Sequence, residues 1–143
     1  MNQFNNSLIY KIHSFIYNVD SAFDETLGKN ASINYTEFLI LLALEENIKY
    51  TQEEIARWSN FTKSTVSKTI DKLVTRKYLL RKEHTTDRRQ KVITFTDLGL
   101  LELEKAQTIA SELSEYLFTP LTSIELESMN GLFNKLALLI LNR

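Results

Sequence analysis

The sequence lacks cysteine altogether and contains only one proline, three glycines and two histidines among its 143 residues. The absence of cysteine excludes disulfide bonds, thiol-based redox sensing and cysteine-ligated metals. A metal centre would need ligands mainly from carboxylates, because His13 and His84 are the only imidazoles. We therefore predict neither a metal nor a cofactor. The scarcity of proline and glycine favours long helices.

Signals for membrane insertion, export and catalysis are also missing. No run of about 18 apolar residues could cross a bilayer, and the N-terminal segment MNQFNNSLIYK has no basic stretch before an apolar one. We find no Cys/His pair, no glycine-rich phosphate loop and no acid pair with a defined pocket. The sequence thus predicts a cytoplasmic protein that is not an enzyme and has no membrane partner.

The distribution of charge is uneven along a chain of otherwise ordinary globular composition. Residues 62–91 contain ten Lys or Arg and three Asp or Glu, whereas the remaining residues contain seven basic and fifteen acidic groups. A basic block on an acidic body is typical of a surface that binds a polyanion. A well-solvated helix and hairpin would show the same charge pattern, so this alternative stays open.

Helix-capping patterns and apolar periodicity divide the single predicted domain, residues 1–143, into helices. In three places a Thr or Asn is followed three residues later by Glu, the arrangement in which each side chain satisfies an orphan backbone N–H. These pairs are Asn34 with Glu37, Thr51 with Glu54, and Thr122 with Glu125. The first predicted helix spans residues 4–27 and is followed by a loop at 28–32. A second helix begins at Asn34, and two more span residues 51–59 and 62–77. A long helix runs from Thr96 to Pro120, and the last helix begins at Thr122.

The final predicted helix is apolar on nearly every face, as its end LALLILNR shows. A helix that is apolar all round must be buried all round. Together with the helix at 4–27 it offers more apolar surface than a monomer of this size would cover, which indicates a homodimer. The alternative is a C-terminal helix enclosed within one chain, although chain ends usually lie at the surface.

Residues 78–84 (YLLRKEH) and 90–96 (QKVITFT) are short β-type runs separated by TTDRR, which predicts a hairpin. Two helices joined by a tight turn at residues 59–60 and followed by a hairpin make a winged helix–turn–helix. The predicted fold class is therefore mainly α with a small β-hairpin. The winged helix–turn–helix occupies residues 34–97, and dimerisation helices occupy residues 1–33 and 98–143.

The predicted helix at 62–77 has two distinct faces. Val66, Ile70 and Leu73 recur at helical spacing and should face the core. Its first turn carries no acid, unlike the four helices opened by Asn or Thr elsewhere, and a helix end that meets phosphates would avoid a carboxylate. Ordinary variation between helices is the alternative. The candidate DNA-binding residues of this helix are Thr62, Lys63, Ser64, Thr65, Ser67, Lys68 and Lys72.

The tip of the predicted hairpin carries Asp87, Arg88 and Arg89, and Lys91 follows. Two exposed arginines can enter a minor groove, where negative potential is focused. Asp87 can hold one guanidinium by a bidentate pair and so orient it. A solvated turn in which Asp87 only favours the turn conformation is the alternative.

At this point the chain resembles the MarR (multiple antibiotic resistance regulator) family of bacterial transcription factors. The resemblance is carried by TQEEIARWSNFTKSTVSKTIDKLVTRKYLLRK and TTDRRQKVITFTDLG, between Thr51 and Gly99. The most specific features are the Asp-x-Arg pair of the hairpin tip and the Thr-x-x-Gly that follows the second strand. Phe95 stands where the family often has leucine, which is a conservative difference.

The resemblance implies a homodimer on a pseudo-palindromic operator, with recognition helices in successive major grooves and wings in the flanking minor grooves. It assigns major-groove roles to Lys63, Ser64, Thr65, Ser67 and Lys68, and the wing role to residues 87–89. It also implies a small aromatic or lipophilic effector. The candidate ligand residues are Tyr10, His13, Tyr17, Tyr35, Phe38 and Trp58, for which the alternative is a role in dimer contacts.

The sequence therefore predicts a sequence-specific, double-stranded-DNA-binding transcriptional regulator, more often a repressor than an activator in such a family. A winged-helix module that binds another protein is the competing hypothesis. Salt dependence distinguishes the two, because binding to phosphates weakens steeply with salt.

Overall fold

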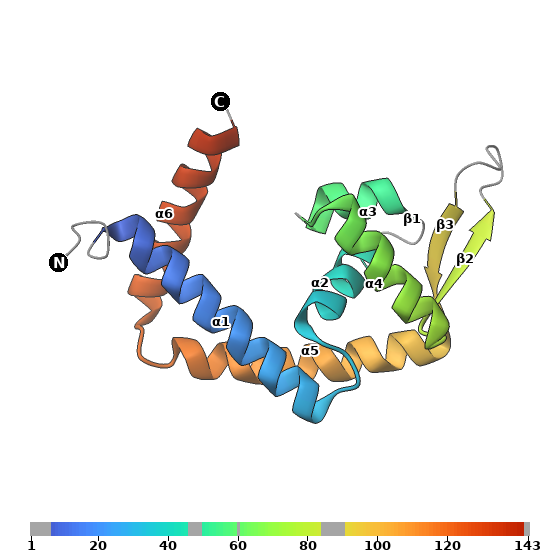
Figure 1. The fold of residues 1–143 in the computed structure, drawn as a ribbon. Coiled ribbons are helices and arrows are strands. Elements are labelled where there is room, and N and C mark those ends of the chain that lie inside the picture. Colours follow the sequence, from blue (N-terminus) through green and yellow to red (C-terminus); the bar gives the residue numbers. More distant parts are fainter. Residues whose placement is uncertain (1–6, 46–49, 60, 84–90, 142–143) are drawn as a thin grey trace. The chain divides into compact units, whose positions relative to one another are not determined.

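The computed structural model describes residues 7–45, 50–59, 61–83 and 91–141. The chain forms two compact units, Met1–Ala110 and Ser111–Arg143, which are described separately below. The elements in chain order are α1 (Leu8–Asn30), α2 (Tyr35–Glu45), β1 (Tyr50–Thr51), α3 (Gln52–Ser59), α4 (Lys63–Thr75), β2 (Leu79–Glu83), β3 (Lys91–Phe95), α5 (Asp97–Phe118) and α6 (Ser123–Leu141) (Figure 1).

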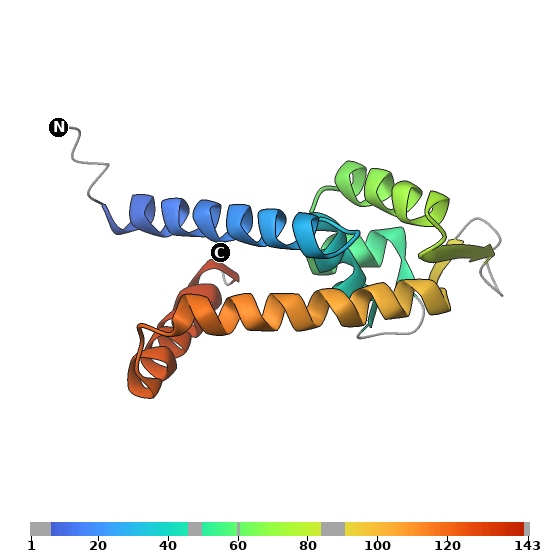
Figure 2. The same ribbon diagram turned by 90° about the horizontal axis from the view of Figure 1, so that it is seen from below.

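The predicted fold class is confirmed. Helices α3 and α4 follow one another across a short connection, and the β2–β3 hairpin follows the C-terminal end of α4 (Figures 1 and 2). The hairpin is antiparallel, with Leu79 opposite Phe95 and Glu83 opposite Lys91. Its tip, residues 84–90, lies outside the described residues.

The sheet contains one strand that the sequence did not indicate. Strand β1 pairs antiparallel with β3, Tyr50 opposite Ile93 and Thr51 opposite Val92, so the strand order is β1-β3-β2. A two-residue strand is too short to produce a readable alternation of polar and apolar residues. It forms because the chain entering α3 passes along the free edge of β3.

The predicted helix caps are confirmed by hydrogen bonds. The Asn34 N–H donates to the Glu37 carboxylate at 3.0 Å, and the Glu37 N–H donates back to the Asn34 side chain at 2.8 Å. Reciprocal bonds of the same kind join Thr51 with Glu54 and Thr122 with Glu125. These bonds satisfy donors that a helix start would otherwise leave unpaired.

Helix α1 differs from its predicted boundaries at both ends. It begins after Ser7, whose hydroxyl accepts from the Tyr10 N–H, and it runs through the predicted loop to Asn30. Gly28 does not end it, because one glycine costs a helix only about 1 kcal/mol and the Asn30 side chain donates to the Thr26 carbonyl at 2.9 Å. Helix α1 also has no acid in its first turn, so this feature is not unique to α4.

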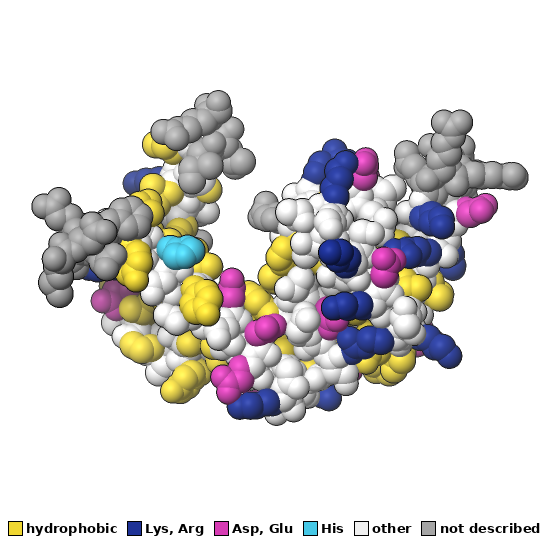
Figure 3. All heavy atoms as spheres, viewed as in Figure 1, with side chains coloured by type: hydrophobic (Ala, Val, Ile, Leu, Met, Phe, Trp, Pro, Cys, Tyr) yellow, Lys and Arg dark blue, Asp and Glu magenta, His cyan; other side chains and the backbone are white. Residues whose placement is uncertain are grey.

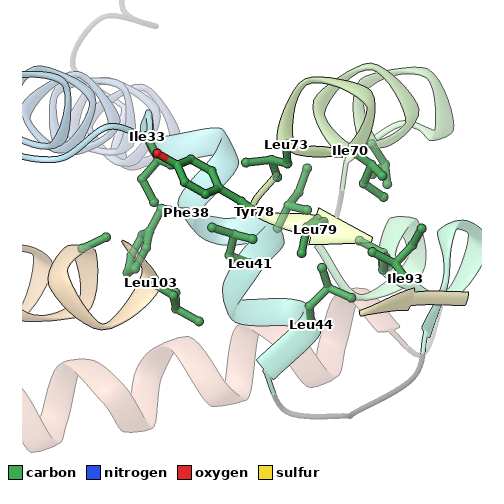
Figure 4. Packing of buried hydrophobic residues seen from close by; sticks show 14 of the residues in the cluster. Ile33, Phe38, Leu41, Leu44, Ile70, Leu73, Tyr78, Leu79, Ile93 and Leu103 are labelled. Carbon is green, nitrogen blue, oxygen red and sulfur yellow. The ribbon is translucent and has the colours of Figure 1, made fainter. Parts of the chain in front are cut away.

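The core of the first unit lies where α2, α3, α4, the sheet and the start of α5 meet. Leu41 from α2, Leu73 from α4 and Leu79 from β2 point toward one another and have no exposed surface (Figure 4). Ile55 of α3 is also fully buried, and Ala56 beside it is small where α3 packs against its neighbours. This packing fixes the orientation of α4 and leaves its opposite face to the solvent.

Helix α4 ends at Thr75, two residues before the predicted end. The Tyr78 N–H donates to the Leu73 carbonyl and the Lys77 N–H to the Val74 carbonyl, both at 2.9 Å. This pair of bonds is the Schellman motif, which requires a left-handed residue after the helix. Lys77 adopts that conformation, with φ of 61°.

Replacing Lys77 with glycine is expected to stabilise the protein by about 0.5–1 kcal/mol, because a left-handed lysine is strained and glycine is not. The urea midpoint at fixed protein concentration measures this change. Lys72→Gly is the matched control: it lies within α4 and should cost about 1 kcal/mol instead. Equal destabilisation by both substitutions would contradict the assignment of Lys77 to the cap.

The junction between the hairpin and α5 is held by Thr96 and Gly99. The Thr96 hydroxyl accepts from the Gly99 N–H at 3.0 Å, and the Thr96 N–H donates to the Tyr78 carbonyl at 3.1 Å. Gly99 is buried, and a Cβ built on it would lie 2.0 Å from the Tyr78 carbonyl oxygen. The Thr-x-x-Gly motif thus anchors α5 against the residue that follows the α4 cap.

The second unit, Ser111–Arg143, contains the end of α5 and all of α6. Within one chain, most of the large apolar side chains of α6 that the structure describes are exposed rather than enclosed. Those with at least 47 % exposure are Ile124, Leu132, Phe133, Leu136, Leu138 and Leu139. None of the helices in the described ranges is long and apolar enough to cross a membrane.

Candidate nucleic-acid interface and pocket

Helix α4 presents one buried face and one polar face. Val66, Ile70 and Leu73 have no exposed surface, as their spacing predicts. The other face carries every candidate recognition residue of the helix. Thr62, Lys63, Ser64, Lys68 and Lys72 are exposed, and Thr65 and Ser67 are half-buried. Hydroxyl and ammonium groups of this kind suit base edges and phosphates.

The N-terminal turn of α4 is capped without a carboxylate. The Thr62 hydroxyl accepts from the Thr65 N–H at 3.1 Å, and the two threonine hydroxyls lie 2.9 Å apart. Because Thr62 satisfies one orphan N–H without adding negative charge, the positive end of the helix dipole stays uncompensated within this turn.

The side chain of Lys63 already has an acidic partner on α3. Its Nζ lies 2.8 Å from a Glu53 carboxylate oxygen, and both side chains are largely exposed. The hydrogen bond and charge of Lys63 lower the pKa of Glu53. An exposed pair of this kind exchanges readily with water and ions, so Lys63 remains available to a phosphate.

A second ion pair joins α4 to the hairpin. Arg81 of β2 donates to the Asp71 carboxylate, which lies on the outward face of α4. Lys82 and Lys91 are exposed on the two strands of the hairpin. The Lys and Arg side chains gather over the part of the surface that carries α4 and the strands (Figure 3). Helix α4 and the hairpin therefore share a surface that is rich in basic side chains.

The predicted wing residues Asp87, Arg88 and Arg89 lie outside the described residues. Their roles remain predictions from the sequence.

A buried carboxylate holds the C-terminal end of α4. Glu37 of α2 is only 5 % exposed, and its Oε2 lies 3.1 Å from Arg76 at the α4 C-cap. Arg76 also donates to the Ser32 carbonyl, and its guanidinium lies 4.8 Å from the centre of the Tyr78 ring. One side chain therefore connects α2, the α1–α2 connection and the residue that precedes β2.

A pocket of about 580 Å³ lies between α1, α2 and the connection from α3 to α4. It is lined by Tyr17, Asp20, Ser21, Asp24, Tyr35, Thr36, Leu39, Ser59 and Phe61. Two of the candidate ligand residues, Tyr17 and Tyr35, are therefore brought together on one cavity. The ring of Tyr35 is stacked on Phe23, with ring centres 4.8 Å apart.

The other candidate ligand residues are placed elsewhere. Tyr10 and His13 lie toward the N-terminal end of α1 and are not part of the pocket lining. Phe38 is buried in the core, with its ring centre 6.4 Å from that of Tyr35. The side chain of Trp58 lies outside the described part of the structure. Among the described residues, no group of three or more His, Cys, Asp or Glu could hold a metal.

Sequence reasoning missed the acids of the pocket. Tyr17, Asp20 and Asp24 follow one another at three- and four-residue spacing, so they share a face of α1. That spacing was a usable signal, but acids on a helix usually indicate only a solvated face. Asp20 and Asp24 differ from such acids because α2 lies opposite them in the fold. The sequence around them does not indicate this position of α2.

Comparison with known proteins agrees with this architecture. The family model for the MarR family matches residues 33–91. The HTH-type transcriptional regulator PapX of Escherichia coli is 26 % identical over 129 residues, which cover 90 % of this chain and 77 % of PapX.

Two of the solved structures that share the fold illustrate the similarity. BpsR of Bordetella bronchiseptica, described in a study of the regulation of its DNA binding by 6-hydroxynicotinic acid, superposes with a TM-score of 0.85 at 20 % identity. The match covers 94 % of this chain and 95 % of BpsR. The transcriptional repressor CouR, solved on a 23-mer DNA duplex, gives a TM-score of 0.85 at 22 % identity and 96 % coverage of both chains.

The matched segment contains α2, β1, α3, α4 and β2, and so it includes α4 and the first strand of the hairpin, which carry basic side chains. Of the two most specific features of the resemblance, the Asp-x-Arg pair falls within the matched segment and the Thr-x-x-Gly junction follows shortly after it. Over residues 33–91 the chain matches the model of the MarR family, and over 129 residues it is similar to an HTH-type transcriptional regulator.

Proposed function

We propose that this protein is a repressor that binds a pseudo-palindromic double-stranded operator as a homodimer. The observation that carries the proposal is the polar face of α4, whose opposite face is fully buried. A helix fixed in this way presents Ser64, Ser67 and Lys68 to the major groove, where each base pair shows a distinct pattern of donors and acceptors. CouR, which has the same fold, is a repressor solved on DNA.

The homodimer part of the proposal is supported by the apolar surface of the outer helices. In addition to the exposed leucines of α6, helix α1 exposes Leu8, Ile9, Phe15 and Ile16 by at least half. Exposed apolar surface of this extent on each of the two helices marks an interaction site. A second copy is the simplest partner, because one interface then covers the same helices on both chains.

Sequence discrimination is expected to depend on α4 and not on the wing. Replacing Lys68 or Ser67 with alanine should reduce the ratio of operator to non-operator affinity by about 1–3 kcal/mol if a base contact is lost. Arg89→Ala should weaken both affinities by similar factors, because an arginine in the minor groove distinguishes few base pairs. It should also reduce the slope of log affinity against log salt concentration by about one, because one phosphate-type contact is lost. Asp87→Ala should partly reproduce Arg89→Ala, since it frees the arginine that Asp87 is proposed to orient.

These effects are measured by titrating operator and scrambled duplexes at several salt concentrations. Lys105→Ala is the matched control, because Lys105 is an exposed lysine of α5 outside the basic surface. If Arg89→Ala abolished discrimination while Lys68→Ala left it intact, the roles of helix and wing would be reversed. Binding that is insensitive to salt would instead favour the protein-interaction module.

The operator should contain two half-sites about one helical turn, or roughly 10 bp, apart, as two-fold symmetric helix–turn–helix dimers require. Selection of bound duplexes from a random pool would reveal them. Inserting five base pairs between the half-sites should lower affinity tenfold or more, because one recognition helix then faces the wrong side of the duplex. The same insertion outside the half-sites should have no effect, and equal losses from both insertions would exclude this geometry.

We propose further that a small effector bound in the α1–α2 pocket weakens DNA binding. The pocket reaches the connection between α3 and α4 through Ser59 and Phe61, so its occupant would contact the residues that precede the recognition helix. The regulation of DNA binding by 6-hydroxynicotinic acid in BpsR, a protein of the same fold, supports this proposal.

A further inference from the structure

The lining of the pocket combines aromatic rings with negative charge. Tyr17, Tyr35 and Phe61 provide rings, and Leu39 adds an aliphatic wall. No lysine, arginine or histidine belongs to the lining as the structure describes it. Asp20 and Asp24 therefore give this part of the described structure a formal charge of −2 with no internal counter-charge.

The two carboxylates differ in how far they are already engaged. One oxygen of Asp24 accepts the Tyr35 N–H at 2.9 Å, which holds the start of α2 against α1 and leaves the second oxygen for another donor. Asp20 makes no ion pair with any described residue. Both side chains are exposed, so the pocket opens to the solvent along α1.

The aromatic groups of the lining carry no charge of their own, and one of them, Tyr35, is held by a neighbouring ring. Tyr35 is stacked on Phe23, so its ring cannot turn freely away from the cavity. Burial, together with the nearby charge of Asp20, raises the pKa of the Tyr35 phenol. The faces of such rings carry the negative part of the aromatic quadrupole and attract cations.

We propose that this pocket binds an organic cation: a flat aromatic or apolar body of drug-like size that carries a positively charged nitrogen. The nitrogen would lie near Asp20 and the free oxygen of Asp24, and the body would lie against Tyr17, Tyr35 and Phe61. The proposal gives the chemical class of the effector, and it rests on the proposed effector function of this pocket.

An anionic effector would meet the opposite conditions. A carboxylate or phenolate in this cavity would leave water without gaining a cationic partner, and it would approach two negative side chains. 6-Hydroxynicotinic acid, which regulates the structural relative BpsR, is an acid. This protein therefore shares its fold with BpsR, while the negative charge of its pocket lining favours a positively charged ligand.

Three probes with the same ring test the proposal: 1-naphthylmethylammonium, 1-naphthalenemethanol and 1-naphthylacetate. Calorimetric titration of the full-length protein without DNA should show saturable binding of the cation at one site per chain. The cation should bind at least about tenfold more tightly than the anion, with the alcohol between them, because an exposed charge pair and a cation–π contact each contribute modestly.

Asp20→Asn should remove most of this preference. It should lower the affinity for the cation about fivefold and leave the affinity for the alcohol unchanged. Glu104→Gln is the matched control, because it removes the same charge from an exposed position on α5 outside the lining. A preference that drops equally in both variants would show a general effect of protein charge and would overturn the site.

Binding and regulation are then separated by adding the cation to the protein–operator complex. Saturable binding that depends on Asp20 but leaves the operator bound would support the cation site and refute its effector role. Tighter binding of the acetate, or no binding of any probe because a second chain fills the pocket, would overturn the inference. Neither of these last two results would affect the proposed DNA-binding function.

Discussion

Replacing Leu136 and Leu139 together with aspartate is expected to abolish the dimer and with it most of the folded protein. The two side chains are 49 % and 63 % exposed on α6 within one chain, so a partner is needed to cover them. In a symmetric dimer the double substitution places four carboxylates in an apolar interface, and each unpaired buried charge costs several kcal/mol. The dissociation constant should therefore rise by at least about a thousandfold.

Sedimentation equilibrium and far-UV circular dichroism over a range of protein concentrations measure the loss of dimer and of helix together. Leu80→Asp is the matched control, because this leucine of β2 is 44 % exposed but lies on the hairpin. It should leave the dimer intact. A native protein that sediments as a stable, fully folded monomer would refute the proposal, since dimer and fold are expected to be inseparable.

Gly99→Ala is expected to destabilise the protein by about 3 kcal/mol or more, at the upper end of the cost of overpacking. The added Cβ would lie 2.0 Å from the Tyr78 carbonyl oxygen and 2.9 Å from its carbon, and backbone atoms cannot turn aside as a flexible side chain would. Helix α5 would have to move away from Tyr78 to relieve this clash. That movement would break the hydrogen bonds from Thr96 to the Tyr78 carbonyl.

Urea unfolding at fixed protein concentration compares Gly99→Ala with Gly28→Ala. Gly28 lies within α1, and a Cβ there meets nothing within 4 Å, so alanine should stabilise the helix by about 0.5–1 kcal/mol. DNA binding should fall for Gly99→Ala at temperatures where much of the protein has unfolded. Similar stability of the two variants would show that the close approach of α5 to Tyr78 is not maintained in solution.

The local elements of this fold follow from short-range sequence patterns. Each reciprocal cap, such as Asn34 with Glu37, joins residues three positions apart, so the bonds that start a helix are present in the sequence itself. The spacing of Val66, Ile70 and Leu73 likewise determines which face of α4 is buried. Because the remaining face then points away from the core, the spacing alone indicates which side of α4 carries the candidate recognition residues.

The sequence also indicated the hairpin but not the third strand or the end of α4. Strand β1 has only two residues and exists because β3 offers it an unpaired edge. Helix α4 stops two residues early because Lys77 adopts a left-handed conformation that non-glycine residues rarely take. A lysine at this position prefers a right-handed conformation, and the packing around Tyr78 overrides that preference.

Long-range contacts decided the rest. Sequence composition gave no sign that Glu37 would be buried against Arg76, 39 residues away, because a capping glutamate usually remains in solvent. The candidate pocket depended on the same kind of information: Asp20 and Asp24 form an ordinary acidic helix face until α2 lies opposite with Tyr35. The sequence by itself determined the helices, the hairpin and the exposed recognition face, since these depend on neighbours along the chain. Only the tertiary structure decided the pocket, its charge and the close approach at Gly99, since these depend on neighbours in space.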